Sequence, residues 1–127
     1  MSYQLLIAVA DRQRIRIGRL GTFDFPAGRY LYTGSARRAL EARLARHLRP
    51  HKRLHWHIDY LLAAPGVAVL AVRRSTLPEC HLCQRSGGAV IAPGFGASDC
   101  RAGCGSHLRF HGDCRDHPGW VLGDRID

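Results

Sequence analysis

The chain has 127 residues, 46% of them hydrophobic, and its 19 Lys and Arg against 10 Asp and Glu give a formal net charge of +9. This length suits one domain with a hydrophobic core of its own. An arginine-rich excess of positive charge favours a polyanionic partner such as DNA, because guanidinium groups bind phosphate oxygens bidentately. The alternative is a protein that is merely basic.

The sequence contains neither an apolar run of about 18 residues nor the apolar segment of a secretory signal peptide, which argues against membrane insertion and secretion. We therefore expect a cytoplasmic protein without a membrane partner, in which the five cysteines stay reduced. The odd number of cysteines also argues against a closed disulfide framework. The oligomeric state is left open.

Three strands are predicted in the first part of the chain. Residues 3–9 are almost all apolar, which is typical of a strand buried on both faces. Residues 14–17 alternate Arg and Ile, as a half-buried strand does, and we expect the two runs to form a hairpin across the polar turn at 11–13. The tyrosine-rich residues 28–33 predict a third strand beside them that ends in a turn at Gly34.

Helices and a further strand are predicted next. Ser35 suits an N-cap, and the proline-free run after it predicts a helix that ends before Pro50. Residues 54–62 predict a short amphipathic helix. The continuous apolar run 67–72 predicts another buried strand, so the pattern as a whole indicates an α+β fold.

A candidate site lies where the third strand meets the first helix. Tyr32 is at the strand end, and Arg43 and His47 are one helical turn apart on one face, so the side chains can converge. The alternative is a packing tyrosine next to a solvated helix face. A series of residues here resembles the second half of the GIY-YIG nuclease motif: Tyr32, Thr33, Gly34, Ser35, Leu40, Arg43, Leu44 and His47. Tyr3 lies where the first tyrosine of that motif belongs.

Two further stretches extend the resemblance. Trp-His-Ile-Asp-Tyr-Leu at 56–61 and Glu-Cys-His-Leu at 79–82 are similar to the small DUF123-like branch of that superfamily, a stand-alone domain that is also found fused to DNA-repair glycosylases. The resemblance implies a single GIY-YIG-like domain over residues 1–127, with a small antiparallel sheet of about three core strands flanked by helices. It also implies a metal-dependent DNA endonuclease with a role in DNA repair.

The roles of individual residues follow from this resemblance. Tyr32 and Arg43 would belong to the phosphodiester-cleaving centre, with Arg43 on the scissile phosphate and either Tyr3 or Tyr32 taking the water proton or orienting the water. His47 would assist them or contact the DNA backbone. Glu79 would hold a Mg²⁺ or Mn²⁺ ion.

Glu79 also has a purely structural interpretation. Thr76 followed three residues later by Glu79 is the pattern of a capping box at a helix start, with Pro78 in the first turn. The capping role and the metal role are not exclusive.

Basic residues gather between the third strand and the second helix, and we expect them to bind DNA phosphates. The candidate DNA-binding residues are Arg37, Arg38, Arg46, Lys52, Arg53 and His57.

A Cys/His-rich segment begins at about residue 98. Cys80 and Cys83 form a C-x2-C pair, and Cys100 and Cys104 a C-x3-C pair, close to the ligand spacing of a structural zinc site. The alternative is that cysteines on the predicted third helix are small buried hydrophobes. The resemblance favours a metal or packing cluster of Cys80, Cys100, Cys104 and His107.

Two other functions compete with the nuclease. One is a non-catalytic nucleic-acid-binding module, and a structure in which Tyr32, Arg43 and Glu79 face one cleft would argue against it. The other is a zinc-stabilised interaction domain, which stoichiometric zinc without DNA affinity would favour.

Overall fold

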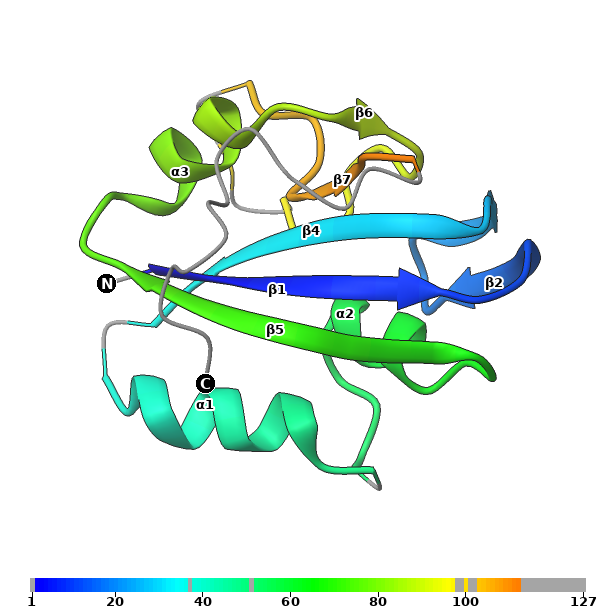
Figure 1. The fold of residues 1–127 in the computed structure, drawn as a ribbon, viewed down its shortest axis with the longest axis horizontal. Helices are drawn as coiled ribbons and strands as arrows, with labels where there is room; N and C mark the ends of the chain where they lie inside the picture. The colour runs from blue at the N-terminus through cyan, green and yellow to red at the C-terminus, as the bar shows by residue number, and fades with distance from the viewer. Residues whose placement is uncertain (1, 37, 51, 98–99, 101–102, 113–127) are drawn as a thin grey trace.

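The computed structural model describes residues 2–36, 38–50, 52–97, 100 and 103–112 (Figure 1). The elements in chain order are β1 Ser2–Val9, β2 Gln13–Ile17, β3 Gly21–Phe25, β4 Gly28–Ser35, α1 Leu40–Leu48, α2 His57–Leu62, β5 Val67–Ser75, α3 Glu79–Ser86, β6 Ala89–Val90 and β7 Leu108–Phe110. The predicted α+β class is confirmed. Among the described residues, no helix has the length and apolar character needed to span a membrane.

The main sheet has five strands in the order β5-β1-β4-β7-β6, and each neighbouring pair is antiparallel. The long strands β5, β1 and β4 lie side by side in Figure 1. β1 is central, and most of its side chains are buried, as the apolar run at 3–9 predicted. The run at 67–72 forms its neighbour β5, which extends to Ser75.

The predicted hairpin between the first two strands is wrong. β2 pairs with β3 in a separate two-stranded sheet, because both edges of β1 are already occupied by β4 and β5. The alternation within β2 is as predicted, with Ile15 and Ile17 buried and Arg14 and Arg16 exposed. The two isoleucines join the main core, so β2 contributes through its side chains rather than through the sheet.

The predicted N-cap at Ser35 and the predicted turn at Gly34 are also wrong. β4 stays paired with β1 as far as Ser35, which lies opposite Ser2, so both residues belong to the strand. α1 begins only at Leu40, after Ala39 in a left-handed conformation with φ 53°, and no side chain caps it. Its end at Leu48 agrees with the predicted stop before Pro50.

The other helix starts differ from the sequence expectation as well. α3 begins at Glu79 with Pro78 at the N-cap and no side-chain cap, so Thr76 and Glu79 do not form the predicted capping box. The reason is that β5 continues to Ser75, whose hydroxyl accepts a hydrogen bond from the Leu77 amide at 3.0 Å and turns the chain there. The second helix is shorter than predicted, because α2 begins at His57.

Asp59 explains where α2 begins and how it is joined to α1. Its fully buried carboxylate accepts backbone hydrogen bonds from His55 at 2.9 Å and Trp56 at 2.8 Å, which occupies the amides before the helix. The same carboxylate accepts a hydrogen bond from each terminal nitrogen of Arg46, at 2.8 and 2.9 Å. Burial opposes ionisation, but the hydrogen bonds from Arg46 and the two amides lower the pKa of Asp59 below its ordinary value.

We predict that Asp59→Ala lowers the free energy of unfolding by about 3 kcal/mol at neutral pH, because it removes the buried acceptor of both the Arg46 guanidinium and two backbone amides. Because the pKa of Asp59 is lower in the folded than in the unfolded state, its carboxylate stabilises the fold fully at any pH above the unfolded-state pKa, near 4. This stabilisation is lost as the pH falls through the lower folded-state pKa. The difference between wild type and mutant in urea unfolding should therefore shrink below about pH 4. The exposed Asp24, changed to Ala, is the control. A difference that does not depend on pH would contradict this role.

Candidate functional site

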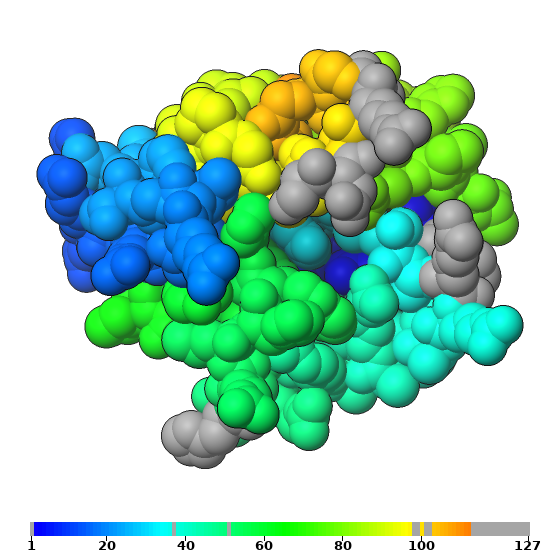
Figure 2. Space-filling view, turned by 180° about the vertical axis from the view of Figure 1, so that it is seen from behind, coloured from blue at the N-terminus to red at the C-terminus, as the bar shows by residue number. Residues whose placement is uncertain are grey.

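A polar cleft of about 430 Å³ lies beside the central strands. Figure 2 shows it as a hollow between the residues of α1 and α2, in cyan and green, and the yellow segment that precedes β7, with the dark blue of β1 at its floor. Tyr3, Tyr32, Arg43 and Glu79 all line this cleft. The structure thus brings together four of the predicted catalytic residues, which come from β1, β4, α1 and α3.

The floor of the cleft is fixed by the register of β1 against β4. Tyr3 lies opposite Gly34, and Tyr32 lies opposite Leu5, so the two tyrosines share one face of the sheet with ring centroids 6.3 Å apart. A Cβ atom at position 34 would lie 2.5 Å from the Tyr3 ring. Glycine is needed at position 34 because the Tyr3 ring crosses the backbone there.

His47 is the predicted catalytic residue that the structure keeps out of the cleft wall. Only 2% of it is exposed, and its Nε2 lies 2.7 Å from the Tyr3 hydroxyl in a hydrogen bond. Burial lowers the pKa of His47 to about 4, so its imidazole is neutral at physiological pH. His47 therefore supports Tyr3 through this hydrogen bond and is too buried to contact a DNA backbone directly.

Both tyrosines are protonated phenols in this environment. Burial raises the pKa of Tyr3 to about 12, and the nearby Arg43 offsets only part of that effect. Burial also raises the pKa of Tyr32 well above its ordinary value, and Tyr3 and Glu79 add to the increase. Near neutral pH both hydroxyls therefore keep their protons, and the Tyr3 hydroxyl is already engaged with His47 Nε2.

Contacts with Ser35 and Trp56 help to hold Arg43 in place. One terminal nitrogen donates to the Ser35 carbonyl at 2.6 Å, and the guanidinium lies 4.7 Å from the centre of the Trp56 ring. In the sequence, Trp56 stood out as part of the amphipathic stretch 54–62, and its support of Arg43 was not predicted. A tryptophan close to an arginine-rich helix is the signal that would have indicated a cation–π contact.

Some of the predicted DNA-binding residues make contacts within the protein, and others are exposed at the surface. Arg46 is paired with buried Asp59, and Lys52 donates to the carbonyls of His47 and Arg49 at 3.0 and 2.7 Å, so both support the structure around the end of α1. Arg38 and Arg53 are exposed. Arg37 lies outside the described residues.

His57 is the remaining predicted DNA-binding residue, and it lines the cleft. Its Nδ1 accepts a hydrogen bond from the Gly96 amide at 2.8 Å, which joins the start of α2 to the loop that precedes β7. Burial lowers the pKa of His57. A neutral His57 is consistent with this acceptor role at Nδ1.

Glu79 is the first residue of α3, and its side chain is 27% exposed. Of the described residues that line the cleft, it is the only one with a carboxyl group. Burial raises its pKa, while His107, Ser35 and Arg43 act in the opposite direction.

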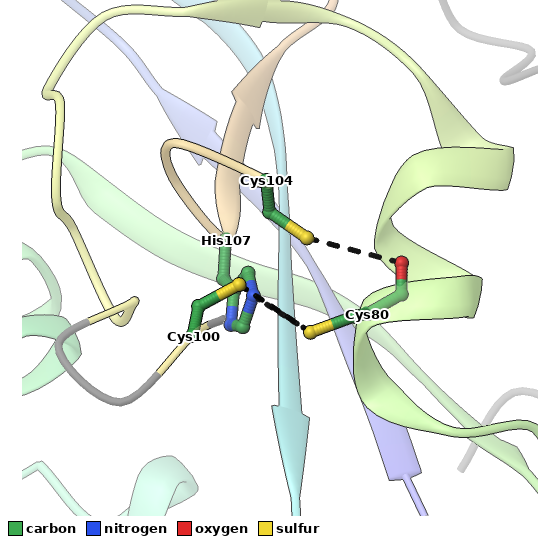
Figure 3. A group of neighbouring side chains, drawn as sticks. All are labelled: Cys80, Cys100, Cys104 and His107. Atoms are coloured by element: carbon green, nitrogen blue, oxygen red, sulfur yellow. Dashed lines mark hydrogen bonds between the residues drawn. The ribbon is translucent and has the colours of Figure 1, made fainter. Parts of the chain in front are cut away.

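A second group of side chains lies close together beside the cleft (Figure 3), and Cys80, Cys100 and His107 of this group line it. Cys80 comes from α3, whereas Cys100, Cys104 and His107 come from the loop that precedes β7. One candidate ligand atom from each of the four lies within 4.8 Å of all the others, which confirms the predicted cluster and fits a metal ion. Burial and the neighbouring thiols of Cys100 and Cys104 raise the pKa of Cys80 to about 12.

Cys83 does not belong to this cluster, although the C-x2-C spacing placed it with Cys80. It is buried in the interior, 1% exposed, and its thiol donates to the Ser106 carbonyl at 3.5 Å. The interpretation as a small buried hydrophobe therefore holds for Cys83 and not for Cys80.

A family model described as "Domain of unknown function DUF123" matches residues 2–119, and the chain belongs to this family. The match confirms the DUF123 part of the resemblance seen in the sequence. Neither the curated proteins nor the solved structures that were compared gave a match.

The close approach at Gly34 yields a prediction. Gly34→Ala should lower the free energy of unfolding by about 1–3 kcal/mol, because the new methyl group overlaps a ring that is buried and hydrogen-bonded to His47. In a Tyr3→Leu background the ring is absent, so the same change should cost much less. Urea unfolding of the two single mutants and the double mutant measures this coupling. Additive effects would show that the Tyr3 ring does not determine the residue at position 34.

Proposed function

We propose that this protein is a metal-dependent DNA endonuclease with a GIY-YIG-like domain. The observation that carries the proposal is the convergence of Tyr3, Tyr32, Arg43 and Glu79 in one polar cleft of a chain with a net charge of +9. These residues match the motif positions to which the family resemblance assigns catalysis. The antiparallel α+β fold is compatible with it.

Arg43 is suited to bind the scissile phosphate. Hydrolysis of a phosphodiester places extra negative charge on the phosphate oxygens in the transition state, and a fixed guanidinium stabilises that charge. The hydrogen bond to Ser35 uses one terminal nitrogen, and the contact with Trp56 orients the plane of the group. A guanidinium carries five donors in all, so Arg43 can also contact a phosphate in the cleft.

Glu79 is suited to hold the divalent cation, which would polarise a phosphate oxygen and lower the pKa of a bound water. Tyr3 is suited to orient the attacking water, because its hydroxyl is fixed by the 2.7 Å hydrogen bond with neutral His47. Tyr32 lines the cleft beside Tyr3 and is suited to orient the water or the phosphate. The remaining candidates at the surface, Arg38 and Arg53, would contact the DNA backbone.

A second candidate function is a non-catalytic DNA-binding module. Burial raises the pKa of Glu79, and its carboxylate lies 3.4 Å from His107, so both the proton and the imidazole compete with a cation for the same group. In this case the arginines would bind phosphates while the cation centre fails to assemble.

Electrostatic DNA binding is the first expected property. If about five phosphates are neutralised, affinity should fall by roughly two to three decades between 50 and 200 mM salt. Arg38→Gln and Arg53→Gln should each reduce the slope of log affinity against log salt by about one, whereas Arg14→Gln on β2 should leave it unchanged. Fluorescence anisotropy with labelled DNA measures these slopes. Affinity that does not change with salt would remove the electrostatic interface.

Glu79→Gln separates the enzyme from the binding module. It removes the charge that holds the cation, so cleavage should fall by about three decades or more. DNA affinity should hardly change, because the arginines supply it, and the melting temperature should change little, because Glu79 caps no helix. Glu41→Gln, at an exposed glutamate of α1, is the matched control and should cleave normally. Cleavage, affinity, melting temperature and zinc content are measured on the same samples, and full cleavage by Glu79→Gln would exclude Glu79 from catalysis.

A further inference from the structure

We propose that Cys80, Cys100, Cys104 and His107 hold one structural Zn²⁺ ion, and that Glu79 is the carboxylate partner of His107 behind that ion. This inference does not depend on the nuclease proposal, because it concerns the wall of the cleft and not the reaction in it.

The spacing of the ligand atoms suits a tetrahedral zinc site. Zinc–sulfur bonds of about 2.3 Å and zinc–nitrogen bonds of about 2.0 Å place ligand atoms roughly 3.5–3.8 Å apart in a tetrahedron. The Cys80 sulfur lies 3.5 Å from the Cys100 sulfur and 3.7 Å from His107 Nε2. An ion between these groups would therefore require only small side-chain movements.

The ligand types select the metal and its role. Three thiols and one imidazole are a ligand set of structural zinc sites, whereas Mg²⁺ and Ca²⁺ prefer oxygen ligands. Four protein ligands complete a tetrahedral shell and leave no position for water or substrate. The zinc shell is therefore complete without Glu79, whose carboxylate borders both this centre and the proposed cation site.

Glu79 completes the second layer of the site. His107 is 1% exposed, and its Nδ1 has no hydrogen-bond partner among the described residues, while Glu79 Oε1 lies 3.4 Å from it. Zinc on Nε2 leaves the ring proton on Nδ1, and the second nitrogen of a zinc-bound histidine usually donates to a carboxylate or carbonyl. The proposed arrangement gives this buried nitrogen an acceptor and explains why a carboxyl group is half-buried there.

The site also explains how the glycine-rich loop that precedes β7 is held. Gly96 in this loop lies against two residues of the cleft. Its amide donates a hydrogen bond to His57, and a Cβ at this position would lie 3.0 Å from the Tyr32 ring. A loop with little apolar area gains order from a metal that joins it to a helix. Zinc would link this loop to α3 and so fix one wall of the cleft.

Metal content tests the first half of the proposal. Protein expressed with added zinc and purified under reducing conditions should contain one zinc per chain by mass spectrometry of the metal. After replacement by Co²⁺, it should show the visible absorption of a tetrahedral cobalt–thiolate centre. Protein without zinc that also fails to bind Co²⁺ would overturn the proposal.

Cysteine variants identify the ligands. Cys104→Ser should lose the zinc or bind it far more weakly, whereas Cys83→Ser, a buried cysteine outside the cluster, should keep one zinc per chain. Equal loss from both variants would show that general damage to the fold, not ligation, removes the metal. If Cys104→Ser fails to fold, Cys100→Ser and the cobalt spectrum of the wild type decide the question.

Glu79→Ala tests the second layer. Loss of an outer partner of a zinc-bound histidine should weaken zinc affinity by about 10–100-fold while stoichiometry at excess zinc stays at one. Glu41→Ala, at the exposed glutamate of α1, should bind zinc as the wild type does. Competition with a chromophoric chelator measures both affinities, without any assay of cleavage. Equal affinities for Glu79→Ala and wild type would remove Glu79 from the zinc site.

Discussion

The pairing of Tyr3 with Gly34 across β1 and β4 is the constraint on which the cleft depends. Because position 34 has no side chain, the Tyr3 ring can cross the neighbouring strand and reach buried His47. A shift of one residue in this register would turn Tyr3 to the opposite face of the sheet. The register of β1 against β4 therefore determines which tyrosine hydroxyls line the cleft.

The walls of the cleft are fixed by two polar centres on opposite sides. On one side, buried Asp59 holds Arg46 and the backbone before α2, which places Trp56 beside Arg43. On the other side, Cys80 on α3 meets the ligand residues of the loop before β7, next to Glu79. Arginine, phenol and carboxylate thus line one cleft, and the imidazole that supports Tyr3, that of His47, is neutral.

The sequence predicted those features that depend on local pattern or on spacing, and it failed where distant segments compete. The apolar runs at 3–9 and 67–72 became β1 and β5, and the cysteines at 80, 100 and 104 met as expected. The pairing of β2 could not be predicted, because it depends on which strands occupy the edges of β1. The same limit applies to Arg46, since only the folded chain shows which of many arginines neutralises buried Asp59.

The most direct test of the proposed function is a cleavage panel of linear, nicked, branched and single-stranded DNAs, incubated with the zinc-loaded wild-type protein and with Mg²⁺, Mn²⁺ or neither. We expect cleavage of at least one DNA form that requires the added cation and that is lost in Arg43→Ala prepared in the same way. Intact DNA in every lane, from folded protein that binds the same DNAs, would contradict the assignment and leave a DNA-binding module.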